Sequence, residues 1–160
     1  MLTYWFNCVK KLYSDGCPID ISGGIRAMTG VVVSNEVVNK AHVLVVDDNA
    51  ILLRTVKDML AEDYSVAIAV SGAQAFMSIE KHKPDLILLD YEMPIVDGAE
   101  VFQLLRDDPK ANDIPVIFLT ASADREVVTK LISLNPAGYM LKPPKKDKLL
   151  EMIAGVLKKK

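Results

Sequence analysis

The chain has 160 residues, of which 51% are hydrophobic and 25% are charged, and its formal net charge at pH 7 is −2. This length and composition suit one α/β domain with a full core plus a modest extension, and they are not typical of a disordered chain. Broad electrostatic binding of nucleic acid is disfavoured because no basic stripe is present, and no apolar run approaches the ~18 residues of a membrane span.

The cysteines and the first residues favour a cytoplasmic protein. Cys8 and Cys17 do not form a CxxC pair and have no histidine at metal-ligand spacing, which is typical of reduced thiols. Lys10 and Lys11 follow the first apolar residues instead of preceding them, so this segment does not fit a signal peptide. We therefore expect a cytoplasmic location.

Residues 1–40 differ from the rest of the chain. Apolar residues recur at helical spacing over 2–13 and predict a short amphipathic helix, and turn-forming residues follow over 14–18 and 22–24. Two interpretations remain open: an extension that precedes the real start at Met28, or a helix that docks on the domain, on a second subunit or on a partner. The expected organisation is an N-terminal extension over 1–40 and a domain over 41–160.

From Ala41 onward, apolar runs alternate with helical patterns. The runs predict buried strands over 42–46, 65–70, 85–90, 114–119 and 137–141. The intervening segments predict helices over 49–60, 71–82, 98–108 and 124–134, and a last one from about 145. Leu104 and Ile132 are among the residues expected to face the core. The alternation predicts a parallel sheet with right-handed crossovers and helices on both faces.

Four of the strand runs stop at residues suited to chemistry: Asp47-Asp48, Asp90, Thr120 and Lys142. Because the carboxyl ends of parallel strands lie at the same edge of the sheet, these residues should converge on one pocket. Neighbouring carboxylates repel each other unless a cation lies among them, and Mg²⁺ suits such oxygen ligands. With Lys142 and a divalent ion, the three acids would form a neutral site able to receive an anion.

A carboxylate in such a site can act as a nucleophile toward phosphorus. Asp90 is then the nucleophile, Lys142 offsets the phosphoryl charge, and the Thr120 hydroxyl donates to a phosphoryl oxygen after transfer. Each residue also has an ordinary structural interpretation. The acidic pair could serve as helix-start acids, Thr120 could cap the next segment, and Lys142 could be a surface lysine before a proline.

These residues resemble the receiver domains of two-component response regulators, in particular the single-domain chemotaxis and sporulation-relay type. The resemblance spans residues 41–160, in the family's order: Asp47-Asp48, Asp90, Met93-Pro94, Asp97-Gly98, Thr120-Ala121, Tyr139 and Lys142-Pro143. It implies a flavodoxin-like, doubly wound sheet of five strands in the order 2-1-3-4-5, flanked by five helices. It also implies a cis peptide bond between Lys142 and Pro143.

The resemblance implies roles for individual residues. Asp90 would accept a phosphoryl group from a sensor histidine kinase or a histidine phosphotransfer protein. Mg²⁺ would be held by Asp48, Asp90 and the backbone carbonyl of Glu92, with Asp47 acting mainly through water.

The resemblance also implies how the phosphoryl group would be sensed. Thr120 would move toward the phosphoryl group while Tyr139 turns inward, which would change how a downstream protein target binds. A homodimer is one further state that the sequence leaves open.

Other functions remain as alternatives. A phosphatase acting through an aspartyl phosphate would use Asp90 and Mg²⁺, with Glu92 as general acid, but Pro94 and the acidic pair fit a receiver better. A flavin or nucleotide binder is disfavoured because the chain has neither GxGxxG nor GxxxxGK. The chain could also be the receiver fragment of a larger regulator. As it stands, we expect neither direct nucleic-acid binding nor conventional substrate turnover.

Overall fold

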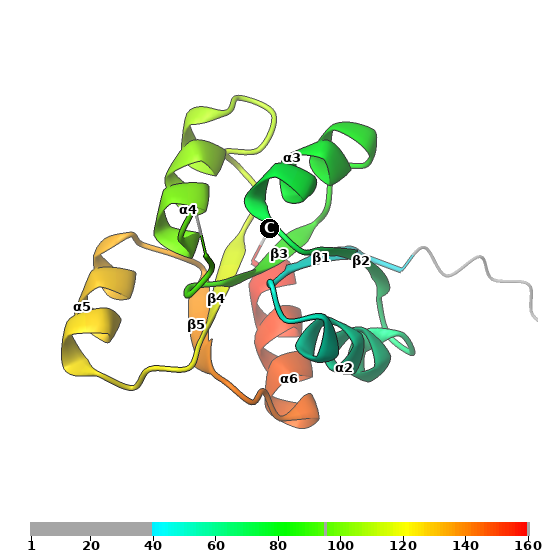
Figure 1. Cartoon of the computed structure of the whole chain (residues 1–160). Coiled ribbons are helices and arrows are strands. Elements are labelled where there is room, and N and C mark those ends of the chain that lie inside the picture. Colours follow the sequence, from blue (N-terminus) through cyan, green and yellow to red (C-terminus); the bar gives the residue numbers. More distant parts are fainter. Residues whose placement is uncertain (1–39, 95, 160) are drawn as a thin grey trace, which may run out of the picture. The chain divides into compact units, whose positions relative to one another are not determined.

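The computed structural model describes residues 40–94 and 96–159, all within the compact unit Asn39–Lys160 (Figure 1). The amphipathic helix predicted over 2–13 and the alternative start at Met28 lie outside the described residues. Among the residues described, no helix combines the length and the apolar character needed to cross a membrane.

The described domain is built on a single parallel sheet with the strand order β2-β1-β3-β4-β5, which confirms the flavodoxin-like order (Figure 1). Its strands are β1 His42–Val46, β2 Ser65–Ala69, β3 Leu86–Asp90, β4 Val116–Thr120 and β5 Gly138–Leu141. Every residue of β3 and β4 is buried, as expected for apolar runs covered on both faces. The predicted run over 65–70 ends one residue early, and Val70 is 43% exposed.

Helices alternate with the strands, as the sequence predicts. They are α2 Ala50–Leu60, α3 Gly72–Lys81, α4 Gly98–Asp107, α5 Arg125–Ser133 and α6 Lys146–Leu157. Three of them begin at a side-chain cap that accepts backbone N–H groups: Asn49 for α2, Ser71 for α3 and Asp97 for α4. These caps fix where each helix starts after its strand.

The sheet separates two apolar cores. One core lies under α3, α4 and α5, and its sheet residues include Leu44, Leu89 and Phe118. The other lies under α2 and α6, with Leu88 and Leu119 from the sheet. Figure 1 shows α3 and α4 on one side of the strands and α2 and α6 on the other. Alternate residues of each central strand thus supply opposite cores.

Two residues predicted to face the core are exposed instead, so those predictions were wrong. Leu104 is 52% exposed and Ile132 is 60% exposed. Each has an apolar neighbour in sequence, Leu105 or Leu131, which is buried in its place. Because consecutive residues point about 100° apart around a helix, only one of each pair can face the sheet. In α4 the buried face also includes Phe102.

Candidate functional site

The strand ends bring the predicted residues together at one edge of the sheet. Asp47 follows β1, Asp90 ends β3, Thr120 ends β4 and Lys142 follows β5. The Lys142 Nζ atom lies 2.7 Å from Asp47 Oδ2 and 2.7 Å from Asp90 Oδ1. One lysine therefore joins carboxylates that lie 43 residues apart in the sequence.

Three carboxylates form a compact acidic cluster. One oxygen each from Asp47, Asp48 and Asp90 lies within 4.8 Å of the others. The side chains of Asp47 and Asp90 are 0% and 1% exposed, whereas Asp48 is exposed. A cluster with two buried acids and one solvent-facing acid is open to a cation from one side.

The inner carboxylates are held by backbone groups as well as by Lys142. The backbone N–H of Asn49 donates to Asp47 Oδ1 at 2.8 Å, and the N–H of Glu92 donates to Asp90 Oδ1 at 3.1 Å. Despite its short contact with Lys142, buried Asp47 Oδ2 has no hydrogen bond of acceptable geometry among the described residues. Three carboxylates whose oxygens lie this close together repel one another, and such a cluster fits a hard cation such as Mg²⁺.

The pKa values of Asp90 and Lys142 are both raised, but for different reasons. Burial raises the pKa of Asp90, and the hydrogen bonds from Lys142 and the Glu92 N–H only partly offset it. Burial also works against the charged form of Lys142, but the contacts with Asp47 and Asp90 outweigh it and raise the pKa of this ammonium group. Lys142 therefore stays cationic at the acidic edge.

The two residues expected to form a switch occupy different surroundings. Thr120 is fully buried, and its Oγ1 accepts a hydrogen bond from the Ser122 N–H at 3.1 Å. The capping interpretation of Thr120 is therefore compatible with a role at the site. Tyr139 is 38% exposed and lies in register with Phe118 on the neighbouring strand. In this conformation the tyrosine ring does not belong to the buried core.

The loop after β3 contains a constraint that the sequence analysis missed. The Gly98 N–H donates to the Tyr91 carbonyl at 3.0 Å, and a Cβ atom at Gly98 would overlap the Asp90 carbonyl oxygen. The Asp97-Gly98 pair in the sequence indicated only a turn. After β5, the Lys142–Pro143 peptide bond is cis, as the resemblance implies.

Comparisons with known proteins agree with this arrangement. The family model "Response regulator receiver domain" matches residues 43–154. The polar-differentiation response regulator DivK of Brucella ovis is 33% identical over 116 residues, which cover 72% of this chain and 94% of DivK. The hybrid signal transduction histidine kinase D of Dictyostelium discoideum is 33% identical over 119 residues, 74% of this chain.

Solved structures of chemotaxis and receiver proteins are also similar to this chain. CheY4, a chemotaxis protein of Vibrio cholerae, has a TM-score of 0.68 and 27% identity, and the match covers 73% of this chain and 98% of CheY4. The receiver domain of the sensor histidine kinase PA1611 of Pseudomonas aeruginosa has the same TM-score and identity, with coverages of 74% and 98%. That structure has a magnesium ion coordinated in its active site cleft.

The relatives differ greatly in length. The matched part of the chain spans 8% of histidine kinase D, 56% of the probable transcriptional regulator ycf29 of Porphyra purpurea and 12% of the sensor histidine kinase TmoS. The chain therefore matches only part of each of these three relatives.

Proposed function

Because the chain belongs to the receiver domains of two-component response regulators, we propose that it is a phosphorylation-dependent switch with Asp90 as its phosphoryl acceptor. The contact of Lys142 with both Asp47 and Asp90 is the observation that carries this assignment. It joins a buried nucleophile, a second acid and a cation at one edge of the sheet. The extension over 1–40 and the receiver domain over 41–160 are part of the same proposal.

The proposed reaction is transfer of a phosphoryl group from a phosphohistidine. Asp90 Oδ1 already contacts Lys142 and the Glu92 N–H, so we assign Oδ2 as the attacking oxygen. A P–O bond forms as the P–N bond breaks, and the electron pair of that bond remains on the departing imidazole, which takes up a proton. The product is an aspartyl phosphate, and Lys142 then neutralises part of the added negative charge.

Mg²⁺ fits the acidic cluster. Asp48, Asp90 and the Glu92 carbonyl would hold it, and Asp47 would act mainly through water. The ion would reduce the repulsion between the carboxylates and the incoming phosphoryl oxygens. The closeness of one oxygen each from Asp47, Asp48 and Asp90, all within 4.8 Å of one another, supports this assignment.

The response would pass through Thr120 and Tyr139. Thr120 Oγ1 accepts from the Ser122 N–H, and its hydroxyl proton can turn to a phosphoryl oxygen. Movement of Thr120 would leave space near Phe118, and Tyr139 lies on the adjacent strand with a partly exposed ring. Its inward turn would reshape the surface formed by α5, β5 and α6, where a downstream protein target would bind. That surface is also where we would place a homodimer contact.

Partners and location follow from the family. Receiver domains are paired with histidine kinases or histidine phosphotransfer proteins, and the relatives include such kinases. A cytoplasmic location without direct nucleic-acid binding remains part of the proposal.

The assignment is tested by intact mass after incubation with Mg²⁺ and acetyl phosphate. Wild-type protein should gain one phosphoryl group, and Asp90→Asn should gain none. The matched control is Asp107→Asn, which removes an exposed carboxylate at the end of α4 and should leave labelling intact. Equal labelling of wild type and Asp90→Asn would overturn the choice of acceptor. Omitting Mg²⁺ should slow labelling strongly.

The same preparation distinguishes a switch from a phosphatase. The Glu92 side chain is exposed, and the contact of this residue with Asp90 is made by its backbone N–H. This favours a backbone role for Glu92 over that of a general acid. We expect one phosphorylation per chain and no sustained hydrolysis of p-nitrophenyl phosphate. Multiple turnover that disappears in Glu92→Gln would instead establish the phosphatase.

Hydrogen exchange tests the switch. Phosphorylation should increase amide protection in β5 of wild type, because Tyr139 becomes packed. Thr120→Ala should still accept a phosphoryl group but should lose that change in protection. If β5 responds equally in Thr120→Ala, the coupling does not pass through this residue.

A further inference from the structure

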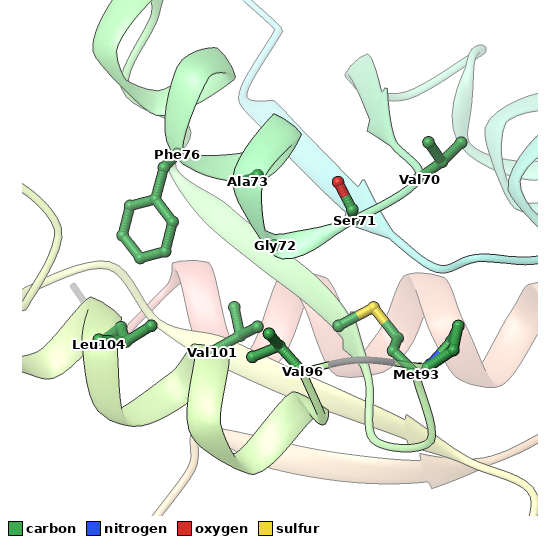
Figure 2. Close-up of a pocket in the computed structure, with 10 residues that line it drawn as sticks. Val70, Ser71, Gly72, Ala73, Phe76, Met93, Val96, Val101 and Leu104 are labelled. Atoms are coloured by element: carbon green, nitrogen blue, oxygen red, sulfur yellow. The ribbon is translucent and has the colours of Figure 1, made fainter.

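An apolar cleft lies between α3 and α4, and the function proposed above does not use it. Its volume is about 500 Å³, within the range of pockets that bind ligands. Phe76, Val101 and Leu104 line it from the two helices, and Val70, Met93 and Val96 line it from the loops after β2 and β3. Figure 2 shows Phe76 pointing from α3 toward Val101 and Leu104 of α4.

Several apolar side chains of the cleft are exposed to water. Leu104 is 52% exposed, Val70 is 43% exposed and Val96 is 36% exposed. Single exposed apolar residues are ordinary, but several gathered around one concave surface mark an interaction site.

The shape of the cleft depends on a close approach of the two helices. A Cβ atom at Gly72 would lie 2.7 Å from Val101 Cγ2, so the glycine lets the start of α3 rest against α4. Phe76 and Leu104 flank the cleft about one helical turn further along each helix. Two helices that hold a groove between them suit a third helix, whose anchors recur every three or four residues.

The rim of the cleft is acidic. Glu80 lies one turn after Phe76 on α3, and Glu100 lies one turn before Leu104 on α4, so both carboxylates flank the apolar side chains. Both glutamates are exposed.

The basic residues of these two helices do not cancel this charge at the cleft. Lys81 is five residues after Phe76 and thus points well away from it around α3. Arg106 donates to the carbonyls of Asn112 and Ile114, and its guanidinium carbon lies 4.4 Å from the centre of the Phe102 ring. Arg106 is therefore held at another part of the surface.

We propose that this cleft binds an amphipathic helix of a partner protein, with large apolar side chains on one face and Lys or Arg along its edges. The apolar anchors would fill the space between Phe76 and Leu104, and the basic side chains would pair with Glu80 and Glu100. A neutral apolar molecule would leave the acidic rim without a partner. Met93 and Val96 belong to the loop that follows Asp90, but the docking site does not depend on phosphorylation of Asp90.

The test uses a fluorescently labelled synthetic helix of Leu and Lys, about five turns long, with all its Leu residues on one face. Its binding to the full 160-residue chain is followed by fluorescence anisotropy. Leu104→Lys should weaken binding by about tenfold or more, because it removes an apolar contact and places a like charge in the cleft. The matched control is Ile132→Lys, a comparably exposed helix position on α5, which should leave affinity unchanged.

Two further measurements separate the roles of apolar contact and charge. The double variant Glu80→Gln with Glu100→Gln should also weaken binding, and the remaining binding should depend less on salt. A peptide of the same composition, scrambled so that its Leu residues share no face, should not bind. These results hold independently of how well Leu104→Lys folds, since the first alters exposed carboxylates and the second alters only the peptide.

Four outcomes would overturn the proposal. They are no binding to wild type, equal binding of the scrambled peptide, loss of binding in Ile132→Lys but not in Leu104→Lys, and unchanged binding in the glutamate double variant. A wild-type dimer that dissociates in Leu104→Lys would assign the cleft to a second copy of the chain. Tighter binding of a peptide of residues 1–14 would assign it to the chain's own N-terminal sequence.

Discussion

The three central strands, β1, β3 and β4, differ from the edge strands β2 and β5 in how fully their residues are buried. Phe118 of β4 and Tyr139 of β5 are partners in register, yet Phe118 is 0% exposed and Tyr139 is 38% exposed. Val45 of β1 and Ile68 of β2 show the same contrast, with exposed fractions of 0% and 46%. Neighbouring positions in one sheet thus have different surroundings.

This contrast separates residues that packing holds in place from residues that we expect to move or to contact a partner. Asp47 and Asp90, which we assign to the fixed acidic cluster, come from the ends of central strands and are no more than 1% exposed. Tyr139, which we expect to turn, belongs to an edge strand, and Val70, which lines the proposed docking cleft, follows one; both are partly exposed. Packing on both faces holds the chemical groups at fixed distances, whereas a half-exposed side chain can change position at little cost.

The strongest test of the comparison removes one aromatic ring from each strand. Phe118→Ala should destabilise the protein by about 3–5 kcal/mol, because it opens a cavity next to Tyr91 and Phe102. Tyr139→Ala should cost roughly 1 kcal/mol or less, since its ring is already partly in water. Urea unfolding measures both values. Similar losses for the two variants would mean that edge and centre are equally well packed.

A second test adds a Cβ atom at Gly98, where the loop after β3 packs against the end of that strand. Gly98→Ala should destabilise the protein by about 1–3 kcal/mol, because the new Cβ atom must displace the Asp90 carbonyl or the start of α4. Phosphorylation by acetyl phosphate should slow as well, since the same shift moves the acceptor. Unfolding and intact-mass kinetics measure the two effects. Unchanged stability together with an unchanged rate of labelling would show that this loop can shift to accommodate the Cβ atom at little energetic cost.

Much of this organisation could be predicted from the sequence, and the reasons are physical. Continuous apolar runs predict strands buried on both faces, and the polar residues that end them must meet at one edge of a parallel sheet. Asp47, Asp90 and Lys142 were therefore predicted to meet, and the structure brings them within 2.7 Å of the lysine nitrogen.

The features that the sequence did not predict depend on contacts between distant segments. Leu104 and Leu105 have equal hydropathy, and only the packing of α4 on the sheet decides which one is buried. The steric demand at Gly98 likewise arises where the chain returns past the Asp90 carbonyl. The α3–α4 cleft combines residues from both helices and two loops, so no local pattern indicates it.

A third test compares the start of a helix beside the acidic cluster with the start of α5. Asn49 Oδ1 accepts the N–H groups of Ile51 and Leu52, so Asn49→Ala should destabilise the protein by about 1 kcal/mol. Asp124, at the equivalent position before α5, makes no such side-chain hydrogen bond. Asp124→Ala should therefore destabilise the protein by only a few tenths of a kcal/mol. Urea unfolding of both variants decides the matter. An equal or larger loss for Asp124→Ala would show that α5 is held at its start by charge alone.

A small effect of opposite sign is expected at Gly155, in the last turn of α6, where a new Cβ atom would meet nothing within 4 Å. Gly155→Ala should stabilise the protein by about 0.5–1 kcal/mol, because alanine loses less backbone entropy than glycine when a helix forms. The substitution is chemically identical to Gly98→Ala. If the two changes in the free energy of unfolding have opposite signs, the difference must come from the steric surroundings of the two glycines. Thermal and urea unfolding measure the difference. A loss of stability at Gly155 would contradict the open surroundings that distinguish this outer helix from the loop packed against β3.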